Sequence, residues 1–125
     1  MELTIEQALR QGAAAHREGD FENAERIYRT ILQSQPLHPD ANYNLGLIAI
    51  SLNQASAALP LFKIALDGSP KIERFWLSYI DALIQDKQIK NAKRTIKKAK
   101  KRGFPSSKFD ALVKKVYSEN QTINI

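Results

Sequence analysis

The two histidines are the only imidazoles of the chain, and their surroundings offer little for catalysis. His16 lies near the end of the first expected helix, and His38 lies in the turn Pro36-Leu37-His38-Pro39. We expect both side chains to be structural or exposed. The chain has no Cys, which excludes thiol catalysis and thiolate metal sites. It also lacks a phosphate-binding glycine loop, an H-E-x-x-H motif and a G-x-S-x-G motif. We therefore expect no enzyme activity, no cofactor and no metal site.

Charge is distributed unevenly along the 125 residues. Residues 1–70 hold 5 basic and 8 acidic side chains, whereas residues 71–125 hold 14 and 5, which together give the net charge of +6. The basic side chains concentrate in the sixth expected helix, at Lys90, Lys93, Arg94, Lys97, Lys98 and Lys101. Such a helix can attract an acidic partner domain, nucleic acid or an anionic membrane surface, or it can be a solvated outer face. No aromatic residue interrupts this run before Phe104, which disfavours base stacking and makes nucleic acid an unlikely partner.

The longest uncharged stretch, residues 41–62, has the length of a membrane span. It contains several Asn, Gln and Ser residues as well as Pro60, so we interpret it as part of a soluble domain without a membrane span. The N-terminus has no basic segment followed by an apolar run, as a secretory signal would require. The default expectation is a cytoplasmic location.

Small residues recur along the chain at a constant interval of 34 residues. Gly12 and Gly46 form one column, with Ile80 as its third member. Ala24, Ala58 and Ala92 form a second column, and each is followed four residues later by a larger apolar residue, namely Tyr28, Phe62 and Ile96. Small side chains at fixed positions allow helix axes to approach closely. The pattern therefore predicts a repeated helical unit.

These columns resemble the tetratricopeptide repeat, a helix-turn-helix unit of about 34 residues. The second repeat carries the pattern best, with Asn42, Leu45, Gly46, Ala49, Ala58, Phe62, Ala65 and Pro70. The first has Gly12, Ala15, Ala24, Tyr28 and Pro36, and the third has Trp76, Tyr79, Leu83, Ala92 and Ala99. The resemblance implies an all-α, right-handed superhelical stack of three helix pairs. Ile80 departs from the family pattern, so we expect looser packing in the third pair.

Local signals divide the chain in the same way. Thr4 and Gln7 are spaced as a capping box, Gly19-Asp20 separates two helices, and Pro39 suits a first helical turn. We expect the fourth helix to continue through Pro60, because the apolar pattern does so. The repeats are assigned to residues 5–38, 39–72 and 73–105. A capping helix is predicted over 106–119, opening with Ser107 and Asp110, and 121–125 is interpreted as a frayed tail or the start of a linker. Residues 1–120 then form one domain.

The resemblance implies a concave groove lined by the first helix of each pair. The side chains that would face it are Glu6, Arg10, Arg17, Asp40, Tyr43, Asn44, Leu47, Arg74, Leu77, Ser78 and Asp81. We interpret the chain as a non-catalytic module that binds a peptide or partner protein there. Asn44 is the most informative position, because an amide can donate to and accept from an extended backbone at once. Its replacement by Ala is expected to weaken a bound peptide and leave unfolding nearly unchanged.

Some family members hold the C-terminal carboxylate of heat-shock chaperones with five polar side chains. Asn44 matches one of these and Arg74 keeps the charge of another, but Leu9, Ala13 and Ser78 occupy the remaining positions. We therefore reject that function. Two alternatives to peptide binding stay open, namely an electrostatic binder that uses the basic sixth helix, and a scaffold that self-associates through its ends or its groove.

A finer resemblance involves residues 36–46, 58–62 and 75–84. These segments are similar to the N-terminal repeat region of large bacterial proteins that continue into glycosyltransferase, sulfotransferase or methyltransferase domains. The chain has no room for such a domain. The resemblance implies an accessory or recognition module that positions a substrate protein or docks a partner.

Overall fold

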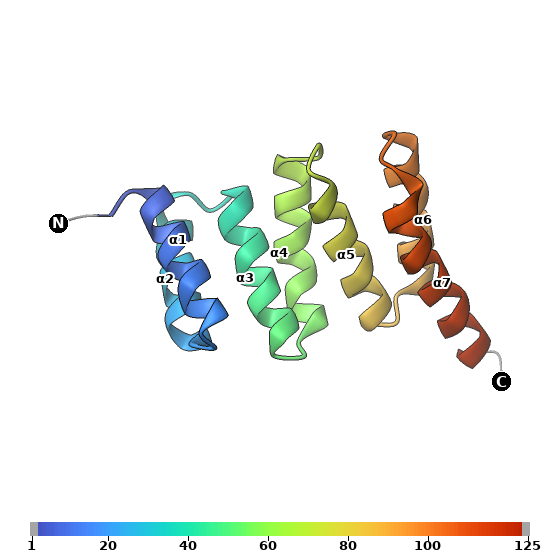
Figure 1. Cartoon of the computed structure of the whole chain (residues 1–125), viewed down its shortest axis with the longest axis horizontal. Coiled ribbons are helices and arrows are strands. Elements are labelled where there is room, and N and C mark those ends of the chain that lie inside the picture. Colours follow the sequence, from blue (N-terminus) through green and yellow to red (C-terminus); the bar gives the residue numbers. More distant parts are fainter. Residues whose placement is uncertain (1–2, 124–125) are drawn as a thin grey trace.

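The computed structural model describes residues 3–123, which form seven α-helices and no strand. Six helices form three consecutive pairs: α1 (Ile5–Arg17) with α2 (Phe21–Ser34), α3 (Pro39–Ser51) with α4 (Ala55–Gly68), and α5 (Glu73–Gln85) with α6 (Ile89–Lys101). A single helix, α7 (Ser106–Ile123), follows. The pairs stand side by side in chain order along the long axis of the molecule (Figure 1). The predicted all-α stack of three pairs plus a terminal helix is confirmed.

The helices begin and end where the punctuation residues predicted. The Thr4 hydroxyl accepts a hydrogen bond from the Gln7 backbone at 3.1 Å, and the Gln7 side chain accepts one from the Thr4 backbone at 2.9 Å. Asp20 caps α2 by accepting from the Asn23 backbone, after Gly19 has turned the chain with a φ of 78°. Pro39 is the first residue of α3. Helix α4 continues through Pro60, as expected.

Two equivalent side-chain bonds close the turns between pairs. The buried Asn42 amide donates to the Pro36 carbonyl at 3.0 Å. One repeat later, the Trp76 indole N–H donates to the Pro70 carbonyl at 2.8 Å. Both donors lie six residues after the proline, so different side chains perform the same task in the same column. Each bond fixes the angle at which a new pair follows the preceding one.

The glycine column allows α1 and α3 each to accept an aromatic ring from the partner helix. A Cβ atom built on Gly12 would lie only 2.6 Å from Cε1 of Tyr28, and one built on Gly46 would collide with Phe62. Tyr28 and Phe62 are both almost fully buried. The small residues are therefore required because large rings fill the space beside them.

The third pair has different residues where its two helices pack together. Ile80 takes the glycine position, and the aromatic position of the partner helix holds the smaller Ile96, so that both side chains are buried. The pair α5/α6 nevertheless packs less closely than the other two pairs. The looser packing expected for the third pair is confirmed.

Helix α7 packs against both α5 and α6. Phe109, Leu112 and Val116 are buried in this contact, and Phe104 in the preceding turn packs against Phe109. Two predicted details need correction. The helix begins at Ser106, which places Ser107 inside its first turn, and it runs to Ile123 instead of ending near residue 119. Residues 121–123 of the predicted tail are thus helical, and 124–125 lie outside the described residues.

The buried side chains form two clusters that meet at α3. The smaller cluster joins α1, α2 and α3 and includes Tyr28, Ile31 and Ile48. The larger cluster extends from α3 to α7 and includes Phe62 and Phe75. Within residues 3–123, none of the helices has the length and apolar character needed to cross a membrane.

Candidate functional site

The first helices of the pairs form one continuous row, which α7 extends. Side chains link neighbouring members directly: His16 Nε2 lies 3.1 Å from Ser51 Oγ between α1 and α3, and Tyr43 Oη lies 2.8 Å from Ser78 Oγ between α3 and α5. The Lys115 ammonium lies 2.9 Å from an Asp81 carboxylate oxygen between α5 and α7. We call the surface formed by α1, α3, α5 and α7 the first-helix face; its helices stand in front in Figure 1. Helix α7 occupies the place that a fourth first helix would take.

Three predicted groove residues, Tyr43, Arg74 and Ser78, come together at the centre of this face. The Tyr43 ring is only 8% exposed and packs against Phe75 and Phe62, with ring centroids 4.5 and 5.5 Å away. The exposed Arg74 guanidinium lies over the rings of Tyr43 and Phe75, at 5.7 and 5.2 Å from their centroids. The Tyr43 hydroxyl is bonded to Ser78. Tyr43 and Ser78 therefore form a rigid floor beneath an arginine.

Asn44 has a structural partner that sequence reasoning missed. Its side chain acts on the Tyr28 phenol, which belongs to α2, and so forms a polar contact between α2 and α3. Burial raises the pKa of the Tyr28 phenol, while the Asn44 hydrogen bond and the positive charge of Arg17 each act to lower it. Replacing Asn44 would thus remove a polar contact between helices, and its effect on unfolding stays a prediction.

Asp81 is likewise engaged within the molecule. One carboxylate oxygen contacts Lys115, and the other accepts a hydrogen bond from the Gln85 side chain at 3.0 Å. A second pair joins the same two helices, with the Lys108 ammonium 3.1 Å from Glu73 Oε1. The sequence analysis did not identify these pairs. A search for opposite charges 34 or 35 residues apart would have found both.

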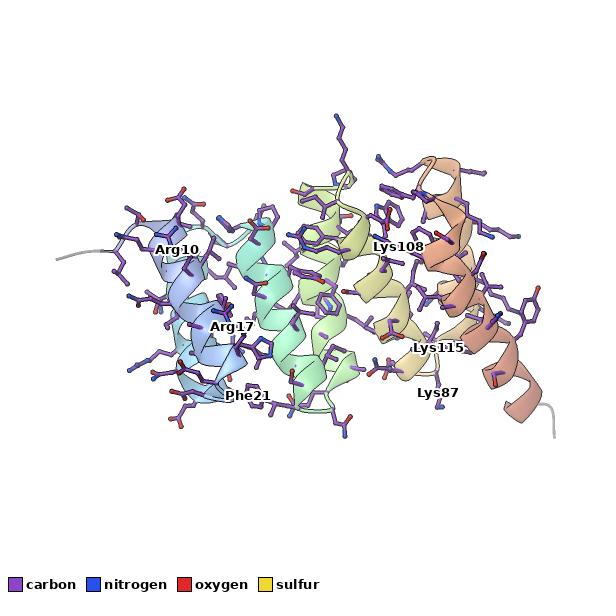
Figure 2. All side chains as sticks on the ribbon, viewed as in Figure 1. Arg10, Arg17, Phe21, Lys87, Lys108 and Lys115 are labelled. Carbon is purple, nitrogen blue, oxygen red and sulfur yellow. The ribbon has the colours of Figure 1, made fainter. Side chains whose placement is uncertain are left out.

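The remaining predicted residues are spread along the face. Arg10, Arg17 and Glu6 on α1 are exposed, and Asp40, Leu47 and Leu77 are half-buried. Within residues 3–123, neither Arg10 nor Arg17 has an ion-pair partner. Figure 2 shows these arginines on α1, at the end of the row opposite Lys108 and Lys115 on α7.

The first-helix face offers binding groups. Its arginines can donate hydrogen bonds to carboxylate or carbonyl oxygens. The two histidines make different hydrogen bonds. The His16 ring is hydrogen-bonded to the Ser51 hydroxyl, whereas the His38 ring caps α3 by accepting a hydrogen bond from the Ala41 backbone at 3.2 Å. Within the described residues, no three His, Asp or Glu side chains are grouped so that they could hold a metal ion.

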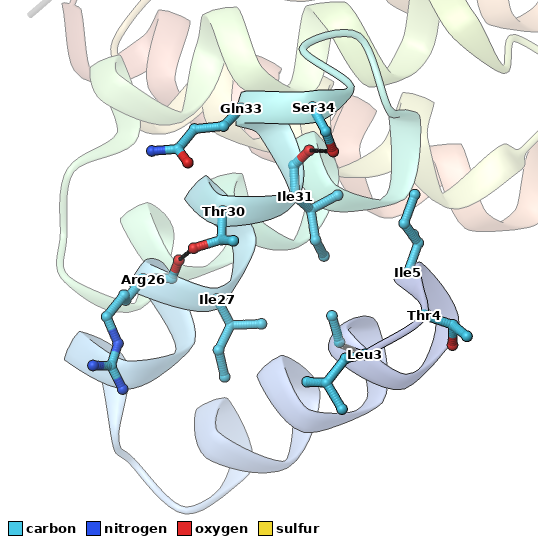
Figure 3. A pocket seen from close by; sticks show the side chains of 10 residues that line it. Leu3, Thr4, Ile5, Arg26, Ile27, Thr30, Ile31, Gln33 and Ser34 are labelled. Carbon is cyan, nitrogen blue, oxygen red and sulfur yellow. Dashed lines mark hydrogen bonds between the residues drawn. The ribbon is translucent and has the colours of Figure 1, made fainter. Parts of the chain in front are cut away.

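A cavity of about 680 Å³ lies elsewhere, between α1 and α2 (Figure 3). Leu3, Ile5 and Ile27 are among its lining side chains. The hydroxyls of Thr30 and Ser34 point back and donate to carbonyls of their own helix. The lining therefore offers mainly apolar contact, and none of the predicted groove residues contributes to it.

The opposite face, formed by the second helices α2, α4 and α6, carries the predicted basic surface. Lys90, Lys93, Arg94, Lys97, Lys98 and Lys101 are all exposed on α6. A cleft of about 340 Å³ separates α4 from α6, and Trp76 and Tyr79 of α5 contribute to its lining. The sequence showed no aromatic residue within the basic run. The fold brings two aromatic residues beside it from the preceding helix.

Solved structures of similar architecture include that of the Yersinia enterocolitica type III secretion chaperone SycD in complex with a peptide of the translocator YopD. It has a TM-score of 0.75 and 18% sequence identity, and the match covers 99% of this chain and 95% of that chain. The TPR2B domain of yeast Sti1, in a complex with pHsp70, has a TM-score of 0.79 and 19% identity, covering 94% and 97%. The Aspergillus fumigatus Sgt2 TPR domain gives 0.74 and 20%, covering 96% and 79%. These likenesses show the fold.

No curated protein sequence matches the chain significantly. The model of the tetratricopeptide repeat family, however, matches residues 9–72, just over half of the chain. Those residues include both glycine positions, Gly12 and Gly46, and the rings that pack against them. The repeat period, the paired helices and the family match agree, and the chain belongs to the tetratricopeptide repeat family.

Proposed function

We propose that the chain is a non-catalytic interaction module that binds a peptide, or an extended segment of a partner protein, along the first-helix face. The observation that carries the proposal is the row of three exposed arginines on the first-helix face, Arg10, Arg17 and Arg74, of which Arg74 lies over the Tyr43 ring that is hydrogen-bonded to Ser78. A rigid floor reduces the ordering cost of binding, and the arginines supply donors for carboxylates and backbone carbonyls.

The similar structures support this proposal. The Yersinia chaperone was solved with a peptide and the yeast Sti1 domain with pHsp70, so proteins of this architecture do bind polypeptides. The bonds of Tyr43 and Asn44 refine the choice of contact residues. We assign Tyr43, Asn44 and Ser78 mainly to the floor, and Arg10, Arg17 and Arg74 to ligand contact, with Glu6, Asp40 and Leu47 at its margin. Asp81 helps to hold α7 in place.

The test begins with peptides selected on the immobilised chain from a random peptide library. We expect backbone amide shifts in NMR spectra to move on α1, α3 and α5 when such a peptide is added. The triple variant R10Q/R17Q/R74Q should bind it about tenfold more weakly or worse, since each arginine contact contributes on the order of 0.5–1 kcal/mol. Lys71→Gln, which removes an exposed charge from the turn before α5, is the matched control and should bind normally. Shifts confined to α2, α4 and α6 would contradict the proposal.

Two further expectations are kept as part of this proposal. One is a cytoplasmic location. The other is kinship with the N-terminal repeat regions of large bacterial transferases, under which the module would position a substrate protein or dock a partner. Self-association through the ends of the stack is the alternative. Sedimentation over a range of protein concentrations distinguishes it, because an end-to-end contact makes the average mass rise with concentration.

A further inference from the structure

Helix α6 presents a continuous ridge of positive charge. Its buried side is defined by Ile89, Ala92, Ile96 and Ala99. With 100° between successive residues, Lys90, Arg94, Lys97 and Lys101 point almost directly away from that side. Lys90 and Lys101 are eleven positions apart, or about 16 Å along the helix axis. The run from residue 87 to residue 109 contains no Asp or Glu.

This charge is not neutralised within the molecule. In the described part of the chain, none of the four ridge residues has a carboxylate at ion-pair distance. The cations thus repel one another, and an external anion would relieve the repulsion. The ridge is far from the arginines of the first-helix face, because α6 belongs to the opposite row of helices (Figure 1).

The cleft between α4 and α6 runs directly beside the ridge. Lys98 and Arg102 from the α6 side contribute cations that have no ion-pair partner within residues 3–123, whereas Lys63 on the α4 wall is paired with Asp67 at 2.7 Å. Its interior includes Leu66, Pro70, Trp76 and Tyr79. Arg102 lies over the Trp76 ring, 5.8 Å from its centroid, and the indole N–H is already bonded to Pro70. A volume of about 340 Å³ suits one large apolar side chain, with positive charges around the entrance.

We propose that the α6 ridge and the adjoining cleft form a second binding surface, for an extended acidic segment of a partner protein that inserts one apolar side chain between α4 and α6. An extended chain rises about 3.3 Å per residue, so about five residues would span the ridge. Alternate side chains of such a segment lie about 7 Å apart. The ridge cations are spaced by about one helical turn, or about 5.4 Å, and the long flexible lysine side chains can make up the difference.

Nucleic acid and membrane fit these observations less well. Stacking requires an accessible ring face, but Trp76 is only 7% exposed and Arg102 lies over it. A membrane-binding helix would carry exposed large apolar side chains, and α6 has none among the described residues.

The test uses a fluorescent peptide of Asp and Glu residues with one central Leu, and a second peptide in which Ser replaces the Leu. Fluorescence anisotropy should show that the Leu peptide binds tighter by about tenfold or more, because burial of a Leu side chain contributes about 1.5–3 kcal/mol. Affinity should fall between about 50 mM and about 200 mM salt. Thr95 of α6 also lines the cleft. In the variant T95Y, whose larger side chain fills the cleft, the two peptides should bind equally.

Two lysine pairs on α6 give a matched comparison. K98Q/K101Q removes charges from the cleft side and the ridge, whereas K93Q/K100Q removes the same charge from the opposite flank of the helix. We expect the first variant to lose about tenfold in affinity and the second less than about threefold. R10Q/R17Q/R74Q should bind the Leu peptide normally, which separates this surface from the first-helix face.

Equal losses in the two lysine variants, or equal binding of the Leu and Ser peptides by the unaltered chain, would show a diffuse charge effect and overturn the proposal. Tighter binding of a single-stranded oligonucleotide, or of vesicles containing phosphatidylserine, than of the Leu peptide would overturn it in favour of those partners.

Discussion

Gly46 shows how a single residue sets the distance between two helices. Its missing side chain leaves room for the fully buried Phe62 ring. Gly46→Ala should therefore lower the free energy of unfolding by up to about 2 kcal/mol, because overpacking costs about 1–3 kcal/mol and the better helix propensity of Ala returns about 1. Urea unfolding followed by circular dichroism measures the change.

The third helix pair suggests a second substitution that should restore stability to the Gly46→Ala variant. In α5 and α6, Ile80 replaces the glycine and Ile96 replaces the ring, so the combination G46A/F62I follows the same principle: a larger residue in the glycine column is paired with a smaller one in the aromatic column. We expect the double variant to be more stable than the sum of the two single changes by about 1 kcal/mol. Simple additivity would show that the two positions do not share the same space.

Tyr28 gives the chain a dependence on alkaline pH. Burial raises the pKa of its phenol, so the folded state keeps the proton at a pH where the unfolded chain, with a pKa near 10, has released it. The stabilising contribution is therefore complete below about pH 10 and is lost as the pH rises through the higher pKa of the folded state. Urea unfolding at a series of alkaline pH values measures the effect. Tyr28→Phe, which lacks the phenol, is the control, and its stability should fall less steeply. Parallel curves for the two proteins would rule out a contribution from Tyr28.

The 34-residue interval predicted which small residues lie where helices pack together, but it did not predict the polar contacts between helices. Gly12, Gly46 and the alanine column recur at one interval, and periodicity reveals them. The contact between Asn44 and Tyr28 occurs once, between helices of different pairs. Within residues 3–123 it has no counterpart in the other repeats, so sequence periodicity could not reveal it. For this reason Asn44 was interpreted as a ligand contact, although its amide also serves the fold.

At the scale of the helix, α7 is held mainly by its apolar side. Phe109 is fully buried, whereas the Lys side chains of the two ion pairs to α5 are 66% and 58% exposed. Phe109→Ala should lower the free energy of unfolding by about 3–5 kcal/mol, but K108Q/K115Q by no more than about 1 kcal/mol, because solvent screens exposed pairs. Urea unfolding, with amide exchange to report on α7 itself, compares the variants. A larger loss in K108Q/K115Q than in Phe109→Ala would mean that charge determines how α7 docks.

Helix boundaries were more predictable than the environment of each helix. Thr4, Asp20 and Pro39 act on neighbours within a few residues, so their roles follow from the local sequence. The position of α7 beside α5 depends on contacts across 34 residues, and the aromatic lining beside α6 depends on how three helices are arranged. Such features require the tertiary structure.

At the scale of the whole molecule, the two buried clusters predict unequal local stability. Each helix pair in a stack is stabilised mainly by its own packing and by contact with the adjacent pairs. The effect of a substitution in the core should therefore stay near the cluster that contains it. Ile31 belongs to the smaller cluster of α1, α2 and α3, and Phe75 belongs to the larger cluster that reaches α7. Ile31→Ala should therefore speed amide hydrogen exchange chiefly in α1 and α2, while Phe75→Ala should speed it from α4 to α7. Both changes create cavities of the kind that cost several kcal/mol, which makes the comparison balanced. Uniform acceleration over all helices in both variants would instead mean that α3 couples the clusters into one cooperative unit.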